Sequence, residues 1–293
     1  MIYFMMVMFV GLLGIVFGSF VNALVWRLHE QEDLLYTKSG DRRKGLSKSD
    51  KSRLRELSVL KGRSMCVDCG HTLSAKDLIP LISWLSVRGK CRYCSHKISW
   101  QYPIVELFTG LMFALSVMFW PYEFNGVVWV GIFALWLIMV VMFVALSVYD
   151  LRWMLLPNKL VFALQFTSLT FALLLAFQLK YSGEALLTPV WGVIFLAGLF
   201  WAMYVVSRQQ WIGGGDVKLA VALGLIVGGP AKALAVLFLA SLLGSVVGIP
   251  AMILGKNGRK ARIPFGPFLM IATILVFWFG SQVIDWYMGK VGI

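Results

Sequence analysis

Seven apolar runs, each close to the length that a helix needs to cross a bilayer, follow one another along this chain. A helix needs about 20 apolar residues to cross the hydrocarbon core. An eighth run, 217–229, reaches only about 20 Å at roughly 1.5 Å per residue, so it crosses only where the membrane is thinned or the protein lines a wet cavity. We expect an all-α polytopic membrane protein with about eight transmembrane helices. The seven long runs are 3–25, 102–120, 127–149, 158–179, 187–207, 231–254 and 266–288.

The positions of the basic residues support eight crossings. Cytoplasmic loops of membrane proteins carry an excess of lysine and arginine. If the N-terminus lies outside, all 27 basic residues fall on the cytoplasmic side except Lys180, Lys232 and Lys290. Without a crossing by the eighth run, the basic cluster at 256–262 would lie outside. The eight-span topology is therefore the one that the charges favour.

The net charge of +13 follows from this topology and does not indicate a nucleic-acid partner. Only 14% of the residues are charged and 59% are hydrophobic, whereas a soluble domain is about 25% charged. Membrane lipid is the expected surrounding. The first run has no basic residue and no small-residue cleavage site before Arg27, so we expect a retained span and not a removed signal peptide.

A hydrophilic segment, 27–101, separates the first span from the others. Residues 1–26 form the first transmembrane helix, and residues 102–293 form the rest of the membrane core. Within the segment, residues 30–64 are highly charged and poor in apolar residues, which predicts a solvated, flexible insertion. Residues 65–100 contain all four cysteines and form a small module that this topology places in the cytoplasm.

The cysteines form two CxxC pairs, with 21 residues between the pairs. This spacing is close to that of zinc ribbons, in which four thiolates close a tetrahedral structural site. The module is therefore expected to hold a structural zinc, and a redox-active or empty site is the alternative. Two histidines, His71 and His96, each follow a pair by two residues, and we expect them to be solvated or to cap the knuckles. The four expected ligands are Cys66, Cys69, Cys91 and Cys94.

Two aspartates are the candidate catalytic residues. Asp150 ends a long apolar run, and Asp216 lies between apolar sequences on both sides. The charge-based topology places both at the cytoplasmic face, although neither was used to build it. Two carboxylates at close range can divide the roles of aspartyl hydrolysis, because one stays ionised to accept a proton from water while the other stays protonated. A structural alternative pairs Asp150 with Arg152 and makes Asp216 a helix N-cap.

Three glycines, Gly213, Gly214 and Gly215, precede Asp216 directly. Because glycine has no side chain, they would let a substrate backbone approach closely and would interrupt the helix next to the acid. The other acid near this face, Glu106, lies in the first turn of a predicted helix, where a carboxylate is favourable, so we expect a structural role. No serine-nucleophile or zinc-protease motif occurs in the sequence.

Together these motifs resemble those of the type IV prepilin leader peptidases, the GxGD-type aspartyl membrane proteases of type IV pilus, type II secretion and competence systems. The resemblance covers nearly the whole chain. Its motifs are Gly18-Ser-Phe-Val-Asn22 with Trp26-Arg27, Pro80-Leu-Ile-Ser-Trp-Leu85 and Gly89-Lys-Cys91 between and within the CxxC pairs, Tyr102-Pro-Ile-Val-Glu106, Tyr149-Asp150 with Leu155-Leu-Pro157, Gly213-Gly-Gly-Asp216-Val-Lys-Leu219, and Pro264-Phe-Gly-Pro-Phe268.

The resemblance implies an inner-membrane enzyme of bacteria that removes the leader of prepilins or pseudopilins on the cytoplasmic side. It also implies methylation of the new N-terminal amine with S-adenosylmethionine in bifunctional members. Catalysis carries over onto Asp150 and Asp216. Two features depart from the family: the insertion at 30–64 is long, and Arg152 occupies the position of a second acid. No glycine-rich cofactor loop is visible, so the S-adenosylmethionine site is unassigned.

Two alternatives remain open. The chain could be a peptidase without methyltransferase activity, which the mass of a processed pilin N-terminus would distinguish. It could also be a membrane transporter or assembly scaffold with a zinc module, in which the aspartates bind a cation or a proton. A transporter tends to hold its carboxylates near the bilayer midplane, whereas these are predicted at one face.

Overall fold

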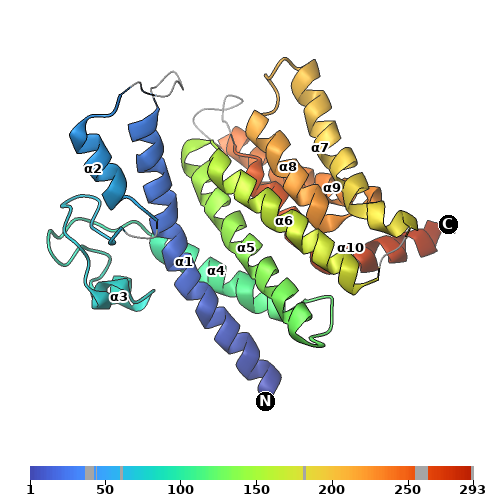
Figure 1. Ribbon diagram of the computed structural model, residues 1–293, viewed down its shortest axis with the longest axis horizontal. Helices are drawn as coiled ribbons and strands as arrows, with labels where there is room; N and C mark the ends of the chain where they lie inside the picture. The colour runs from blue at the N-terminus through green and yellow to red at the C-terminus, as the bar shows by residue number, and fades with distance from the viewer. Residues whose placement is uncertain (37–42, 44, 60–61, 181–182, 255–262, 292–293) are drawn as a thin grey trace. The chain divides into compact units, whose positions relative to one another are not determined.

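The computed structural model describes residues 1–36, 43, 45–59, 62–180, 183–254 and 263–291 (Figure 1). It consists of two compact units, residues 1–118 and 119–293. All regular elements in the described residues are helical, and the two antiparallel bridges in the cysteine module are isolated. The helices of the first unit are α1 (Ile2–Leu35), α2 (Lys48–Glu56), η1 (Ala75–Leu78), α3 (Ile82–Ser86) and α4 (Gln101–Met118). Those of the second are α5 (Val127–Trp153), α6 (Asn158–Gln178), η2 (Gly183–Leu187), α7 (Thr188–Val206), α8 (Gly214–Val227), α9 (Pro230–Leu254) and α10 (Gly266–Val291).

Seven of these helices are long and apolar enough to cross a membrane. They match the seven long runs of the sequence, and the chain is an all-helical, multi-pass membrane protein. The eighth run forms α8, which has 14 residues and a length of about 21 Å at roughly 1.5 Å per residue. Protein surrounds it, because α8 packs against α6, α7 and α10. This enclosure allows a helix shorter than the bilayer to lie among the spans.

The ends of two helices differ from the apolar runs. Helix α1 continues past residue 25 to Leu35, because the Arg, Leu, Glu and Gln residues that follow are good helix formers. Helix α5 continues past Asp150 to Trp153 and ends at Met154, which has left-handed backbone angles. The three residues that follow the aspartate are therefore helical as well. The basic cluster at 256–262 and parts of the insertion at 30–64 lie outside the described residues.

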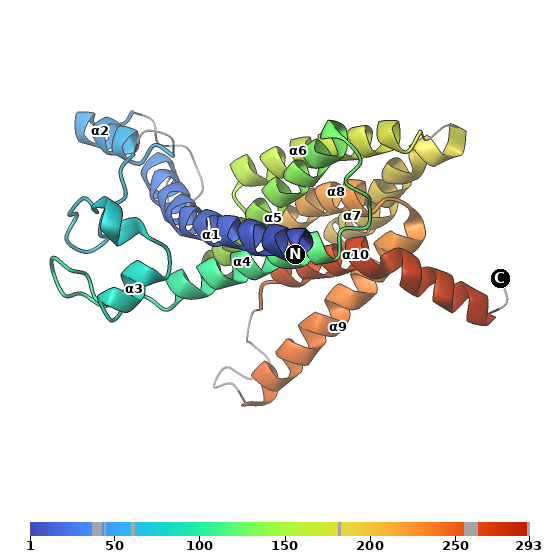
Figure 2. The same cartoon turned by 90° about the horizontal axis from the view of Figure 1, so that it is seen from below.

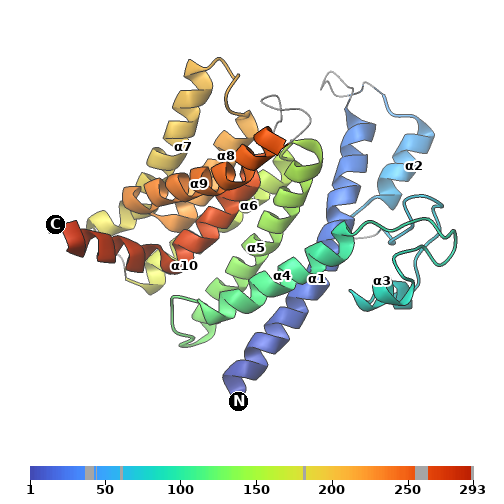
Figure 3. The same cartoon turned by 180° about the vertical axis from the view of Figure 1, so that it is seen from behind.

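In the first unit, α1 and α4 pack side by side through glycines (Figures 1 and 3). A Cβ atom added to Gly14 would lie 2.7 Å from Cβ of Phe113, and one added to Gly18 would lie 2.6 Å from Cα of Glu106. Asn22 donates a hydrogen bond to the Tyr102 carbonyl across the same interface. Small residues on α1 therefore let the two helix backbones approach closely.

In the second unit, α5 and α8, the helices that carry Asp150 and Asp216, share two neighbouring helices. Helix α10 contacts both α5 and α8, and α6 also contacts both. Helix α9 (Figure 2) is buried only in its N-terminal half, at Ala233, Val236 and Ala240. In its C-terminal half, Gly244 lies near Phe265 and Phe268 at the start of α10. The residues around Asp150 and Asp216 are therefore positioned by α5, α6, α8 and α10.

Candidate active site and candidate metal centre

Asp150 lies in the last turn of α5 and is 6% exposed. Its carboxylate accepts a hydrogen bond from the backbone N–H of Gly266, at the start of α10. The contact is close, since a Cβ atom added to Gly266 would lie 2.6 Å from Oδ2 of Asp150. No basic group among the described residues forms an ion pair with it, and a buried carboxylate of this kind is costly in a membrane protein and marks a functional candidate.

Asp216 lies in the first turn of α8, where a negative charge is favourable at the positive end of the helix dipole. The residue that precedes the helix is Gly213, and its N–H donates to the Asp216 carboxylate. The main-chain N–H of Asp216 donates in turn to the Gly213 carbonyl at 3.1 Å. Asp216 is therefore not the N-cap that the structural alternative required, because that position belongs to Gly213.

Contacts between α8 and the chain that follows α5 bring the two aspartates to the same end of the helix bundle. A Cβ atom added to Gly215 would lie 3.2 Å from Cβ of Leu156. The ammonium group of Lys218 donates to the side chain of Asn158 at 2.9 Å. As a result, the carboxylates of Asp150 and Asp216 lie near enough for an electrostatic interaction.

The three glycines before Asp216 have different surroundings. A Cβ atom on Gly213 would meet only Oδ2 of Asp216, at 3.6 Å, and a neighbouring backbone nitrogen. One on Gly214 would meet the Tyr204 ring at 3.6 Å, and one on Gly215 would meet Leu156. The absence of a side chain therefore leaves space beside the carboxylate at Gly213, while at Gly215 it permits close helix packing.

The four predicted cysteine ligands converge. The Sγ atoms of Cys66, Cys69, Cys91 and Cys94 all lie within 4.8 Å of one another, and the Cys66 and Cys94 sulfurs are 3.9 Å apart. A tetrahedral site with metal–sulfur bonds of about 2.3 Å holds its sulfurs roughly 3.8 Å apart. The donor set and its spacing therefore fit a four-thiolate metal site.

The two knuckles repeat the same backbone pattern. In the first, the Cys66 N–H donates to the His71 carbonyl, and in the second the Cys91 N–H donates to the His96 carbonyl. Burial raises the pKa of Cys91, but N–H groups of Tyr93 and Cys94 point at its sulfur, and the net result is a pKa of about 7. Neither histidine belongs to the cluster: His71 stacks on Tyr93, and His96 lies 3.5 Å from Asp68.

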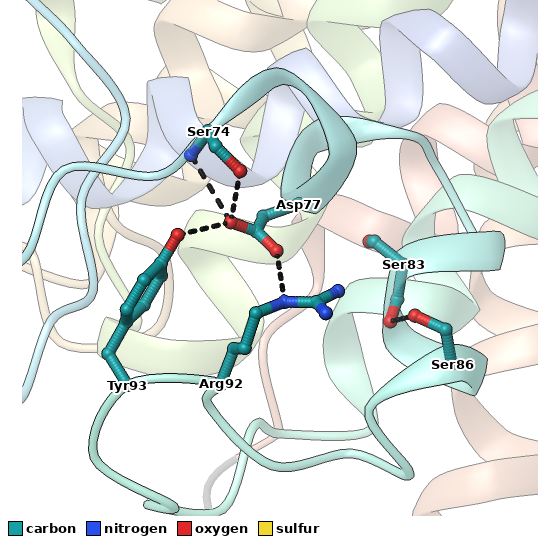
Figure 4. Close-up of polar contacts among 6 residues, drawn as sticks. All are labelled: Ser74, Asp77, Ser83, Ser86, Arg92 and Tyr93. Carbon is teal, nitrogen blue, oxygen red and sulfur yellow. Dashed lines mark hydrogen bonds and ion pairs between the residues drawn. The ribbon is translucent and has the colours of Figure 1, made fainter.

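A carboxylate that sequence reasoning missed ties the module together. Asp77 accepts hydrogen bonds from the Ser74 hydroxyl at 2.6 Å and the Tyr93 hydroxyl at 2.9 Å, and it pairs with Arg92 at 2.9 Å (Figure 4). The Ser74 bond, with smaller contributions from Tyr93 and Arg92, outweighs burial and holds the pKa of Asp77 well below its usual range. Asp77 thus joins the loop after the first knuckle to the second knuckle.

Glu106 has the structural role expected from its position. It is 6% exposed, and its carboxylate accepts the N–H of Leu81 at 2.8 Å. Leu81 has a φ of +60°, so the bond holds a turn that an L-residue rarely adopts. Sequence reasoning missed the contact of Gly266 with Asp150, although this glycine lies in the Pro264-Phe-Gly-Pro-Phe268 motif of the resemblance.

Comparisons with known proteins identify the family to which the chain belongs. Residues 12–120 match the bacterial peptidase A24 N-terminal domain, and residues 137–249 match the type IV leader peptidase family. A prepilin leader peptidase/N-methyltransferase of Aeromonas hydrophila is 34% identical over 95% of this chain and 92% of the relative. Proteins of the same description from Bacillus subtilis (34%, 79% of this chain and 88% of the relative) and Pseudomonas aeruginosa (30%, 96% and 93%) also match.

No solved structure matches the chain. The two matching family models nevertheless cover both units, and the relatives align over nearly their full length. The chain therefore belongs to the type IV leader peptidase family.

Proposed function

We propose that this protein is a membrane aspartyl endopeptidase that removes the leader of type IV prepilins or pseudopilins, with Asp150 and Asp216 as its catalytic pair. The observation that carries the proposal is the electrostatic interaction between these two carboxylates, from helices far apart in the sequence. Membership of the family and the names of the relatives support the substrate class.

In the proposed mechanism, a water molecule between the two carboxylates attacks the scissile carbonyl. The ionised acid takes a proton from this water, and the protonated acid donates to the carbonyl oxygen as it gains negative charge. The Gly266 N–H donates a hydrogen bond that stabilises the ionised form of Asp150, and the Gly213 N–H does the same for Asp216. The substrate backbone would pass through the space beside Gly213. Gly214 and Gly215 have no side chains and so let Tyr204 and Leu156 pack closely against the start of α8.

Replacement of the aspartates tests the peptidase. Asp150→Asn and Asp216→Asn should each abolish cleavage of a prepilin in membranes while leaving the amount of protein unchanged, because each removes one proton-transfer group. Glu123→Gln is the matched control, since this acid lies in an exposed loop and should keep full activity. Cleavage retained by both asparagine variants would exclude the aspartyl mechanism, whereas no cleavage by the wild type would favour a transporter or scaffold.

We further propose that the enzyme methylates the new N-terminal amine with S-adenosylmethionine. The methyl group passes from the sulfonium sulfur to the amine nitrogen, the sulfur keeps the bonding electron pair, and the amine loses a proton. The double name of the relatives supports this activity. The mass of a pilin processed by the purified enzyme tests it, since methylation replaces a hydrogen by a methyl group and makes the N-terminus about 14 Da heavier.

The metal of the four-cysteine site is proposed to be zinc, with a structural role. Four thiolates suit Zn²⁺, and a closed site leaves no position for a catalytic water. Metal analysis of the purified protein should find one zinc per chain, and Cys69→Ser should lower this content. Iron in place of zinc, or a full zinc content in the variant, would contradict the assignment.

The enzyme is proposed to lie in the inner membrane with its N-terminus outside and both aspartates and the cysteine module on the cytoplasmic side. The distribution of lysine and arginine supports this orientation. Thiol labelling in intact cells would test it, with a cysteine introduced at Ser95 compared against the protein that has only its four native cysteines. Labelling of a cysteine placed at Ser95 by a membrane-impermeant reagent would overturn the orientation.

A further inference from the structure

A cavity of about 760 Å³ lies in the first unit, between the end of α1, helix α2 and the first cysteine knuckle. Cavities of about 300–1,000 Å³ are typical of sites for small molecules and cofactors. Its walls combine an aromatic ring, two carboxylates, a guanidinium group, two hydroxyls and apolar side chains. The lining residues are Trp26, Ser49, Ser52, Arg53, Glu56, Leu57, Met65, Cys66, Val67, Asp68, Cys69 and Gly70.

The helix that forms one wall of the cavity is fixed in place. Helix α2 begins with a capping box, in which Ser47 and Asp50 satisfy each other's backbone N–H groups. At its other end, Gln31 donates to the Leu57 carbonyl at 2.9 Å, and Arg27 donates to the Ser58 carbonyl at 3.1 Å. The cavity is therefore preformed between two helices that are bonded to each other.

Several groups in the walls have hydrogen-bonding capacity to spare. Among the described residues, the carboxylate of Glu56 and the indole N–H of Trp26 have no hydrogen-bond or ion-pair partner. Arg53 uses one nitrogen to bind Glu30 at 2.9 Å, and a guanidinium group has five N–H donors in all. A ligand that carries both signs of charge and a flat ring would find a partner for each part.

We propose that this cavity binds S-adenosylmethionine, the methyl donor of the methyltransferase activity proposed above, on which this inference rests. The adenine ring stacks on Trp26, as bases do on aromatic side chains. Glu56 and Asp68 bind the ribose hydroxyls and the ammonium group, and they offset the positive charge of the sulfonium. Arg53 binds the carboxylate of the methionine part.

A basic leader peptide is a poorer match to the same walls. The two acids would attract a peptide with several positive charges, but such a peptide offers no anionic group to Arg53, which lines the cavity beside them. The volume is also that of one small molecule and not of an extended chain. The combination of one guanidinium and two carboxylates around an indole favours the zwitterionic and cationic groups of S-adenosylmethionine.

Binding of radiolabelled S-adenosylmethionine to the full-length, zinc-loaded protein in lipid nanodiscs tests the proposal. Equilibrium dialysis should give dissociation constants raised about tenfold or more for Glu56→Gln and for Trp26→Ala, since each removes a charge-assisted or stacking contact. Trp26→Phe keeps a ring and should fall between wild type and Trp26→Ala. Asp33→Asn is the matched control, because this acid is 71% exposed and lies off the cavity. Unchanged zinc content verifies that each variant has folded.

Hydrogen exchange provides a second measurement on the wild-type protein. S-adenosylmethionine should slow exchange in residues 48–57 and 65–70, which line the cavity, and should leave residues 91–97 of the second knuckle unchanged. This equivalent knuckle is an internal control, because it has the same backbone pattern but does not line the cavity.

The outcomes separate this proposal from the proposed function. If the wild type binds S-adenosylmethionine but Glu56→Gln and Trp26→Ala bind it equally well, the site lies elsewhere and the methyltransferase activity stands. If the wild type cleaves prepilin but binds no S-adenosylmethionine, the methyltransferase activity and this site fail together, and the peptidase stands. Protection of residues 48–57 by a basic leader peptide, with none by S-adenosylmethionine, would make the cavity a peptide site and overturn the proposal.

Discussion

Gly266 lies directly against Asp150, and a Cβ atom at this glycine would lie 2.6 Å from Oδ2 of the carboxylate. Gly266→Ala should therefore push the Asp150 side chain from its position or bend the start of α10. A displacement of about 1 Å in a catalytic group can cost roughly 100-fold in rate. We expect kcat for prepilin cleavage to fall about 10- to 100-fold, measured with purified enzyme in nanodiscs.

Gly198→Ala is the control for this substitution, because a Cβ atom on this helical glycine would meet nothing within 4 Å. Its kcat should equal that of the wild type. A Gly266→Ala enzyme with normal kcat would mean that the contact with Asp150 is not maintained during the reaction.

The close contact of α7 and α8 gives a second prediction, on stability. A Cβ atom on Gly224 would lie 2.7 Å from the carbonyl oxygen of Gly192, so the two helix backbones touch. Gly224→Val should force them apart and destabilise the protein by about 1–3 kcal/mol, the usual cost of overpacking. The midpoint of thermal unfolding in nanodiscs would measure this. Gly131→Val, at a site with no atom within 4 Å, should change the midpoint much less.

The seven long spans could be predicted from the sequence because the length of an apolar run is set by bilayer thickness, a local constraint. The runs at 102–120 and 158–179 correspond to α4 and α6 within two residues at each end. The end of α1 could not be predicted in this way. Its continuation to Leu35 depends on helix propensity and on bonds from Arg27 and Gln31 to residues after α2.

The candidate site was predictable where a residue type was costly or rare. A carboxylate next to apolar sequence stands out, and so does a pair of CxxC motifs. The residues that hold these groups were not predictable, because glycine at position 266 and aspartate at position 77 are common residue types whose partners lie in other segments. Contacts between distant segments depend on how the helices pack, which a periodic pattern does not specify.

Asp77 gives a prediction on the cysteine module. Asp77→Asn keeps the size of the side chain but removes its negative charge. The change abolishes the ion pair with Arg92 and weakens the hydrogen bonds that the carboxylate accepts from the Ser74 and Tyr93 hydroxyls. The module should then open at a lower urea concentration, measured by release of zinc to a chromogenic chelator. Asp68→Asn is a comparison at an exposed acid of the same module, whose contact with His96 is longer, at 3.5 Å, and it should shift the midpoint less.

The pH dependence of this effect has a definite sign. Because the folded state holds the pKa of Asp77 below its usual range, the carboxylate contributes its full stabilisation above the unfolded pKa, near 3.9, and loses it as pH falls toward the folded pKa. The difference between wild type and Asp77→Asn should be constant from pH 8 to pH 5. A difference that shrinks as pH falls through this range would show that another group is responsible.

Arg27 gives the last prediction. This side chain is 6% exposed, and its guanidinium group donates to the carbonyls of Ser58 at 3.1 Å, Val59 at 3.2 Å and Gly62 at 3.0 Å. Carbonyls at the end of a helix lack partners within the helix and attract positive charge. A planar fork of donors can reach three of them at once, whereas a lysine ammonium is a single point charge. Arg27 thus fixes the chain after α2 to α1.

Arg27→Gln should loosen α2 and the chain that follows it. Loss of hydrogen bonds from a charged donor costs about 1.5–3 kcal/mol, which corresponds to amide exchange faster by about 10- to 100-fold in residues 48–57. Arg27→Lys should give partial loss, because the charge remains while the fork does not. Exchange in α4 should be unchanged in both variants, since the α1–α4 contact at Gly14 and Gly18 lies roughly two and a half to three and a half turns away along α1. Equal exchange of residues 48–57 in the wild type and Arg27→Gln would mean that the capping box and the Gln31 bond hold α2 without the guanidinium.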